Sequence, residues 1–119
     1  MGLEDADSTI FHAQKALDWF EMEDNYQKIW VLKYYIGVAY RIKGELEVGL
    51  DWLRDARDVA KEHSKNYQAF GVDVDKEAGE IFIMQGKVEK GQELIRRSES
   101  VRELLKRKSE KEAEDGKHS

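Results

Sequence analysis

The feature that most constrains this chain is a pattern of glycine, aromatic and small residues that recurs after forty-two residues. The first copy reads Ile36-Gly37-x-x-Tyr40-x-x-x-Gly44, then Gly49-x-x-x-Leu53-x-x-Ala56. The second reads Ala78-Gly79-x-x-Phe82-x-x-x-Gly86, then Gly91-x-x-x-Ile95-x-x-Ser98. A period of about 20–50 residues is typical of stacked repeats, in which each unit buries its apolar face against the next. The pattern therefore predicts a helical hairpin present in two copies, and it favours a binding scaffold over a catalyst.

The composition is that of one helical domain. The 119 residues include 40% hydrophobic residues, which is enough for a core. The absence of proline permits long uninterrupted helices, and the absence of cysteine excludes disulfides and thiolate metal sites. No stretch approaches the about 20 apolar residues of a membrane span, and the acidic N-terminus lacks the cationic start of a signal peptide. We therefore expect a soluble, intracellular, cytoplasmic protein that does not bind membranes.

Charge is distributed unevenly along the chain. Seven acidic residues and one lysine occur up to Asp24, whereas Lys and Arg crowd between Arg96 and Lys111. Glutamates interrupt that basic run, namely Glu99, Glu103, Glu110 and Glu112. Nucleic-acid binding needs a sustained basic face, so we expect a solvated helix end here and no nucleic-acid partner.

Apolar periodicity and helix-breaking residues predict five helices, over residues 8–24, 26–43, 45–63, 67–85 and 87–107. Ser8 is the expected N-cap of the first helix, and Gly44 and Gly86 are expected to end two helices in the left-handed conformation. The connector repeats as well, since Asn25-Tyr26-Gln27 returns as Asn66-Tyr67-Gln68. We expect a repeat domain over 1–107, with an N-terminal helix at 8–24 and repeats at 26–63 and 67–107. Residues 108–119 are expected to form a charged, disordered tail.

The first predicted helix has apolar residues on two faces. One stripe comprises Ile10, Ala13, Leu17 and Phe20, and the other side carries Phe11, Trp19 and Met22. Aromatic residues and Met are enriched at interface hot spots, so we predict that the second face meets a partner protein, a second copy in a homodimer, or an upstream part of a longer protein. The alternative is that the helix is wrapped so that both faces are covered internally.

The repeat resembles the tetratricopeptide repeat, in which two antiparallel helices approach closely at small residues. The matching positions are Ile36, Gly37, Tyr40, Gly49, Leu53 and Ala56 in one copy, and Ala78, Gly79, Phe82, Gly91, Ile95 and Ser98 in the next. Lys33 and Asp75 stand where the family often has Trp, the closing Pro is missing, and the period exceeds the usual 34 residues. The longer period is similar to extended-helix variants of the family. The resemblance covers most of residues 6–105, and residues 6–13 resemble half of an earlier repeat.

The resemblance implies an all-α solenoid, a right-handed superhelix of antiparallel helix hairpins, whose first helices line a groove for a peptide or partner helix. By resemblance the groove residues are Val31, Tyr34, Val38 and Arg41, with Asp73, Lys76, Glu80 and Ile83 from the next repeat. Tyr34 and Val38 replace the Lys and Asn of the family's carboxylate clamp, so we expect an amphipathic or aromatic-bearing segment as the ligand. The alternative is that Tyr34 and Val38 belong to the core.

Signals for catalysis or metal binding are weak. Asp73-x-Asp75-x-Glu77 resembles the start of a calcium loop, but the required Gly and final Glu fall at Ala78 and Met84. None of the three histidines has a partner at metal-ligand spacing, namely His12, His63 and His118. We therefore expect no catalytic, cofactor or metal site and a non-enzymatic protein-interaction scaffold. The alternatives are a homo-oligomerising scaffold and, from another class, a small helical enzyme or ligand sensor with an interior pocket.

Overall fold

The computed structural model describes residues 2–117, which form five α-helices and no strand. The helices are α1 (Leu3–Met22), α2 (Tyr26–Ile42), α3 (Leu46–His63), α4 (Tyr67–Met84) and α5 (Val88–Lys117). The predicted all-α fold is confirmed, and the three central helices end within one residue of their predicted bounds. No helix in this part of the chain is both long and apolar enough to cross a membrane.

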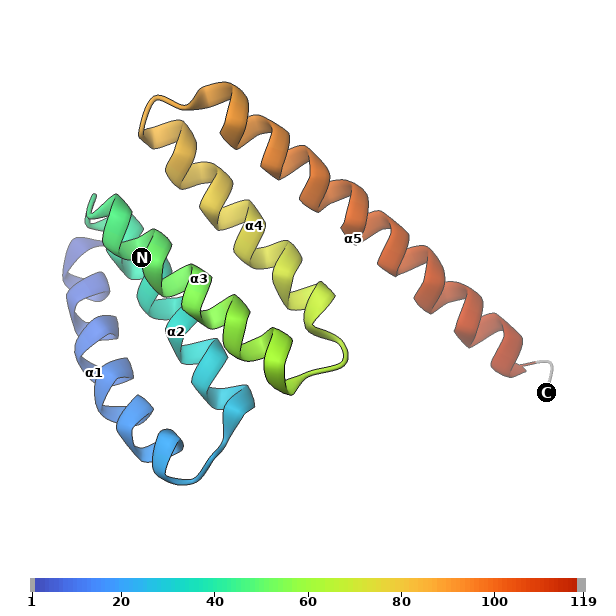
Figure 1. The fold of residues 1–119 in the computed structure, drawn as a ribbon, viewed down its shortest axis with the longest axis horizontal. Helices are drawn as coiled ribbons and strands as arrows, with labels where there is room; N and C mark the ends of the chain where they lie inside the picture. Colours follow the sequence, from blue (N-terminus) through green and yellow to red (C-terminus); the bar gives the residue numbers. More distant parts are fainter. Residues whose placement is uncertain (1, 118–119) are drawn as a thin grey trace.

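Helices that follow one another in sequence pack side by side. α2 lies against α1 and α3, and α4 lies against α3 and α5. Figure 1 shows α1 at one edge of the molecule and α5 at the opposite edge, with the C-terminal part of α5 extending beyond the other helices. The extents of the molecule are 50 × 41 × 24 Å. Its two outer helices therefore each have only one neighbouring helix.

In each hairpin the two helices approach each other closely at a pair of glycines. A Cβ atom added to Gly37 would lie 3.0 Å from the carbonyl oxygen of Gly49, and one added to Gly91 would lie 2.4 Å from the carbonyl oxygen of Gly79. These distances leave little or no room for a side chain, so larger residues would force the helices apart. The predicted close approach of antiparallel helices at small residues is confirmed in both copies.

Two of the helix ends adopt the predicted glycine-dependent conformation. Gly44 and Gly86 have φ angles of +82° and +85°, a region that favours glycine because it has no Cβ. In the connector between α1 and α2, Asn25 caps α2 by accepting a hydrogen bond from the Lys28 backbone N–H at 3.3 Å. The breaks predicted at Gly44, Gly86 and Asn25 therefore lie between helices.

The apolar residues form two core clusters, one for each half of the molecule. The first joins α1 and α2, and its buried members are Ala6, Ile10, Ala13, Leu17, Ile29, Ile36 and Ala39. The second joins α3 and α4, with Leu50, Leu53, Val74, Ala78, Ile81 and Phe82. The predicted stripe of the first helix is confirmed, because Phe20 also packs against the first cluster.

The predicted start of the first helix was wrong. Ser8 lies inside α1, which begins at Leu3 after the N-cap Gly2. Two features extend the helix toward the N-terminus. Ala6 is completely buried and continues the core stripe by one turn, and Glu4 and Asp5 suit the positive end of the helix dipole.

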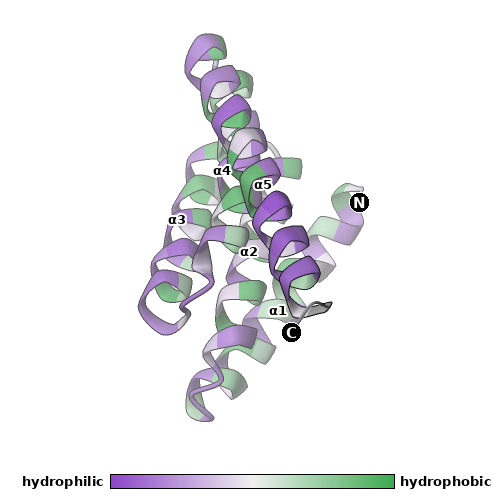
Figure 2. Ribbon diagram, turned by 90° about the vertical axis from the view of Figure 1, so that its right-hand side faces the viewer, coloured by the Kyte–Doolittle hydropathy of each residue, from purple (hydrophilic) through white to green (hydrophobic). Residues whose placement is uncertain are grey.

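The predicted end of the last helix was also wrong. α5 continues to Lys117 instead of ending near Arg107, because the added residues are mostly Lys, Glu and Ala, which favour helix, and none is proline. Every residue from 106 to 116 is exposed. Figure 2 shows this stretch as a largely hydrophilic helix. The expected disorder of 108–119 stays a prediction, and residues 118–119, including His118, lie outside the described residues.

Candidate functional site

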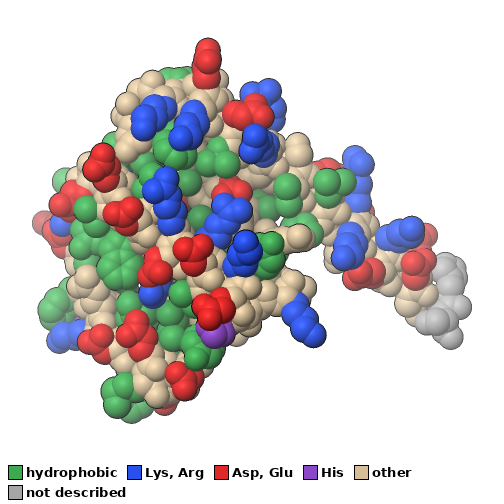
Figure 3. All heavy atoms as spheres, viewed as in Figure 1, with side chains coloured by type: hydrophobic (Ala, Val, Ile, Leu, Met, Phe, Trp, Pro, Cys, Tyr) green, Lys and Arg blue, Asp and Glu red, His purple; other side chains and the backbone are tan. Residues whose placement is uncertain are grey.

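The side of α1 that faces away from the core carries three exposed apolar residues among polar ones. We call Phe11, Trp19 and Met22 the α1 outer face; their exposed fractions are 55%, 60% and 82%. Lys15 lies on the same side, with its ammonium 4.3 Å from the centre of the Phe11 ring. Figure 3 shows hydrophobic side chains among acidic ones on the side of the molecule where α1 lies. The alternative that both faces of this helix are covered does not hold within residues 2–117.

An array of aromatic rings lies where the residues of the predicted groove on α2 meet α4. Phe70 of α4 lies against two rings of α2, with centroid distances of 5.6 Å to Tyr34 and 6.3 Å to Trp30. Tyr35 packs on Tyr34 at 5.7 Å, is half exposed, and lies on the side of α2 that faces α1, where it lines a hollow with His12 and Ala16. We refer to these four residues as the aromatic array. Sequence reasoning missed Trp30 and Phe70, although both come from the helices that were expected to line the groove.

Polar residues of α2 and α4 pair with one another across the two repeats. The Arg41 Nε donates to Glu77 Oε2 at 2.8 Å, and a second guanidinium nitrogen lies 3.6 Å from Glu80 Oε2. Arg41 and Glu80, which sequence analysis placed at one site, are therefore brought together by an internal ion pair. Glu77 was missed as part of this site. The sequence could have indicated Glu77, because it lies one helical turn before Glu80 and opposite Arg41, the single arginine of α2.

The surroundings of Tyr34 raise its pKa above that of an ordinary tyrosine. Burial raises the pKa of Tyr34 to about 12, and the nearby negative charges of Glu77 and Asp73 act in the same direction. The phenol is therefore neutral at physiological pH. Tyr34 is also partly buried against the second core cluster, as is Val38. This packing agrees with the alternative that both residues belong to the core.

The remaining predicted groove residues have separate surroundings. Lys76 is exposed, and Asp73 accepts a hydrogen bond from Arg102 of α5 at 2.9 Å. Ile83 packs against α5, because its Cγ1 atom lies 2.6 Å from the place where a Gly91 Cβ would be. Val31 is half-buried. Ile83 therefore contributes to the packing of the second hairpin.

A cavity of about 420 Å³ lies between the first half of α4 and the middle of α5. Its main apolar lining comes from Gly71, Val72, Val101, Leu104 and Leu105. We call it the α4–α5 cavity. At its polar edge Arg57 of α3 donates to Asp75 at 3.0 Å. Burial raises the pKa of Asp75, and the positive charges of Arg57 and Arg97 oppose that shift. Sequence reasoning missed this cavity. The sequence could have indicated it, because Gly71 and Asp75 stand at helix positions where large residues are common.

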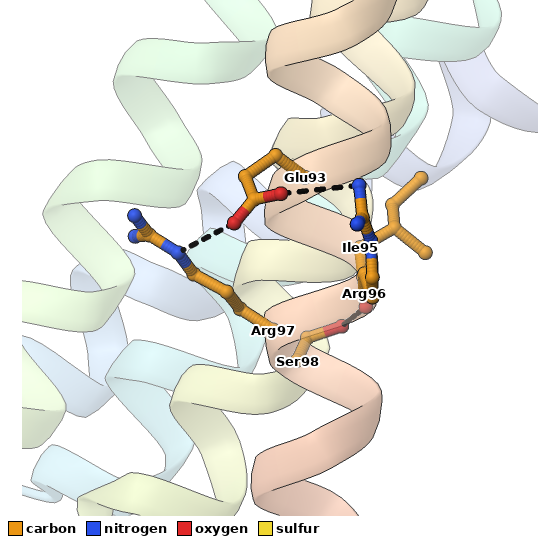
Figure 4. A network of polar contacts seen from close by, with 5 residues as sticks. All are labelled: Glu93, Ile95, Arg96, Arg97 and Ser98. Carbon is orange, nitrogen blue, oxygen red and sulfur yellow. Dashed lines mark hydrogen bonds and ion pairs between the residues drawn. The ribbon is translucent and has the colours of Figure 1, made fainter.

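The outer side of α5 is polar, and part of its charge is neutralised within the helix. Glu93 lies between two arginines, 3.1 Å from Arg96 and 3.4 Å from Arg97 (Figure 4). Ser98 turns inward and donates to the carbonyl of Ile95 at 2.6 Å. The contacts of Glu93 are those of a solvated helix surface, whereas Ser98 is buried.

Within residues 2–117 no three His, Asp or Glu side chains gather so that they could hold a metal ion. His63 stacks on Tyr26 with a centroid distance of 3.5 Å, and His12 contacts the Phe11 ring. Comparison of the chain with models of protein families, with curated proteins and with solved structures finds no match. The resemblance to the tetratricopeptide repeat is therefore carried by the residues of the two hairpins alone.

Proposed function

We propose that this chain is a non-enzymatic protein-interaction module, in which tetratricopeptide-like hairpins support a contact surface on α1. The observation that carries the proposal is the exposure of Phe11, Trp19 and Met22 opposite the buried side of the same helix. Contiguous exposed apolar patches on soluble domains mark interaction sites, and Trp is among the residues that contribute most to binding.

The placement of these residues suits recognition of a helix by a groove. Phe11, Trp19 and Met22 follow one another at intervals of eight and three residues, so they fall on one side of a helix with 3.6 residues per turn. Their backbone is held in place, because Ile10, Ala13 and Leu17 on the opposite side are buried. A rigid apolar helix face loses little conformational freedom when it binds a hydrophobic groove.

The charge of α1 indicates the chemistry of its partner. The chain up to Asp24 has seven acidic residues and one lysine, which gives a net charge of −6 with His neutral. Complementary charge steers association and disfavours wrong partners. We therefore propose that the partner surface is apolar at its centre and basic at its edge.

A peptide library tests the proposal without a known partner. The wild-type chain and the Trp19→Glu variant are immobilised separately, and random peptides that bind the first but not the second are selected. We expect enrichment of apolar peptides with Lys or Arg. Gln14→Glu, an exposed change on the same helix, is the matched control and should retain every selected peptide. No enrichment on the wild-type chain, or equal binding to Trp19→Glu, would contradict the assignment of this surface.

The aromatic array is a second candidate surface, favoured by the half-exposed ring of Tyr35 against Tyr34 and by the ring of Phe70 beside them. The exposed Lys76 also belongs to the groove predicted from the resemblance. To separate this surface from the α1 outer face, all peptides that bind the wild-type chain are tested on Tyr35→Ala and on Trp19→Glu separately, without the counter-selection. Peptides that lose binding to Tyr35→Ala but retain it on Trp19→Glu would assign recognition to the aromatic array.

A further inference from the structure

The α4–α5 cavity exists because one repeat lacks a side chain that the other has. Gly71 lies seven residues before Ala78, as Ile29 lies seven residues before Ile36. Ile29 is buried and fills its place in the first core cluster. Gly71 is also buried, yet a Cβ built there would meet no atom within 4 Å. The second repeat therefore has an open, mostly apolar space where the first repeat has a filled core.

We propose that this cavity receives the α1 outer face of a second copy of the chain, so that the molecules associate head to tail. The inference rests on the proposed function, since it uses the same face of α1, and it names the partner. The two surfaces cannot meet within one molecule, because α1 packs on α2 and the described helices α4 and α5 do not contact it. Figure 1 shows them on opposite sides of the fold.

Charge complementarity favours this occupant. The chain up to Asp24 has a net charge of −6, whereas residues 96–111 contain seven Lys and Arg against three Glu, a net charge of +4. At the cavity itself the charge of Arg57 is balanced by Asp75, so the excess of positive charge lies along α5 beside the cavity. An acidic helix with apolar side chains therefore faces an apolar space next to a helix segment of net positive charge, which is an arrangement that steers association.

The dimensions of the α1 outer face and of the α4–α5 cavity also agree. Phe11 and Trp19 are eight residues apart, or about 12 Å along a helix, and the α5 lining from Ser98 to Leu105 spans seven residues, or about 10 Å. The volume of about 420 Å³ lies in the range of about 300–1,000 Å³ that is usual for ligand pockets. Leu104, which is 62% exposed at the cavity, supplies apolar contact to the incoming helix.

Two single variants test the proposal, one at each surface. Trp19→Glu disables the α1 outer face, and Leu104→Glu disables the cavity. Sedimentation over a concentration series should show the wild-type chain exceeding dimer mass, because a head-to-tail dimer leaves one copy of each surface open to a further chain. Each variant alone should stay at the 13.9 kDa of one chain. An equimolar mixture should form a dimer and stop there, because each variant keeps one intact surface.

The other outcomes are each decisive. A wild-type chain that stays monomeric overturns the inference, and the peptide selection then tests the proposed function separately. If Trp19→Glu is monomeric and Leu104→Glu still dimerises, two α1 helices pair symmetrically and the cavity is not the binding site. A mixture of the two variants that stays monomeric also contradicts the head-to-tail contact.

Further variants guard against misfolding and test the role of charge. Met22→Glu replaces Trp19→Glu at the α1 outer face, and Gly71→Leu blocks the cavity without adding charge; both should give the same monomers. Gln92→Glu, an exposed change on α5, should associate like the wild-type chain. Raising the salt concentration should weaken association several-fold, because it screens the attraction between the acidic helix and the basic region. Association that strengthens with salt would contradict the assigned partner surface.

Discussion

Arg41 and Glu77 join the two helix pairs through a hydrogen-bonded ion pair of 2.8 Å, and both side chains are mostly buried. The contact runs from α2 to α4, two helices that also meet through the ring of Phe70 against Trp30 and Tyr34. Glu80 lies farther from the same guanidinium, at 3.6 Å. The pair therefore adds a polar contact between the repeats to the apolar packing of α3 on α4.

Glu77→Ala should lower the free energy of unfolding by about 1.5–3 kcal/mol, the usual worth of a hydrogen bond to a charged group. The reason is that Arg41 would keep only its longer contact with Glu80. Urea denaturation measures the change. Glu93→Ala removes an exposed acid that pairs with Arg96 and Arg97 on one helix, and it should cost less than about 1 kcal/mol. Equal losses of unfolding free energy in the two variants would show that the contact between repeats contributes no more to stability than an exposed ion pair.

Two Gly→Ala substitutions should have opposite effects on stability. Gly91→Ala places a Cβ 2.4 Å from the Gly79 carbonyl oxygen and should destabilise the fold by about 1–3 kcal/mol. Gly71→Ala adds a methyl group to open space within a helix and should stabilise it by about 0.5–1 kcal/mol. Thermal unfolding of both variants measures the signs. Stabilisation by Gly91→Ala would contradict the close packing of α4 on α5.

The fold should lose stability in alkaline solution through Tyr34. Its pKa is about 12 in the folded chain against 10.0 in the absence of burial, so the folded state holds this proton more tightly than the unfolded state. The stabilising contribution is complete below pH 10 and is lost as the pH rises through about 12. Titration of the phenolate absorbance should show one of the five tyrosines ionising late.

Tyr34→Phe should remove that late step, whereas Tyr35→Phe should leave it in place. A titration in which Tyr34→Phe and the wild-type chain give the same late step would assign it to another residue. Circular dichroism at each pH confirms that the chain is still helical, because unfolding would return Tyr34 to ordinary behaviour.

Deleting residues 108–119 should leave the core intact. Every side chain from 106 to 116 is exposed, so the deletion removes no residue of either core cluster. The free energy of unfolding should change by less than about 0.5 kcal/mol, as for surface changes in general. The helical signal should nevertheless fall, because α5 continues to Lys117. A chain that keeps its full helical signal after the deletion would support the predicted disorder of this segment.

The helices and hairpins could be predicted from local features of the sequence. The forty-two-residue recurrence places Gly37 with Gly49 and Gly79 with Gly91, because only small residues allow such close contact. The positive φ angles at Gly44 and Gly86 follow from a backbone that favours glycine. The apolar outer side of α1 was also predictable, since helical spacing separates it from the buried stripe.

The two wrong boundaries show the limit of local reasoning. Ser8 is a good N-cap in isolation, but Ala6 gains burial against α2 only if the helix starts earlier. Near Arg107 the apolar pattern ends, yet helix propensity continues without it. Tertiary burial therefore decided where α1 begins. It placed no constraint on where α5 ends.

The sequence by itself determined the helix content, the hairpin glycines and the two-sided character of α1, because each depends on the conformational preferences and spacing of nearby residues. Only the tertiary structure decided which polar groups meet. Arg41 and Glu77 are thirty-six residues apart, and their pairing depends on the angle between two hairpins. The α4–α5 cavity was decided in the same way, since an absent side chain at Gly71 leaves a space only when α3, α4 and α5 surround it.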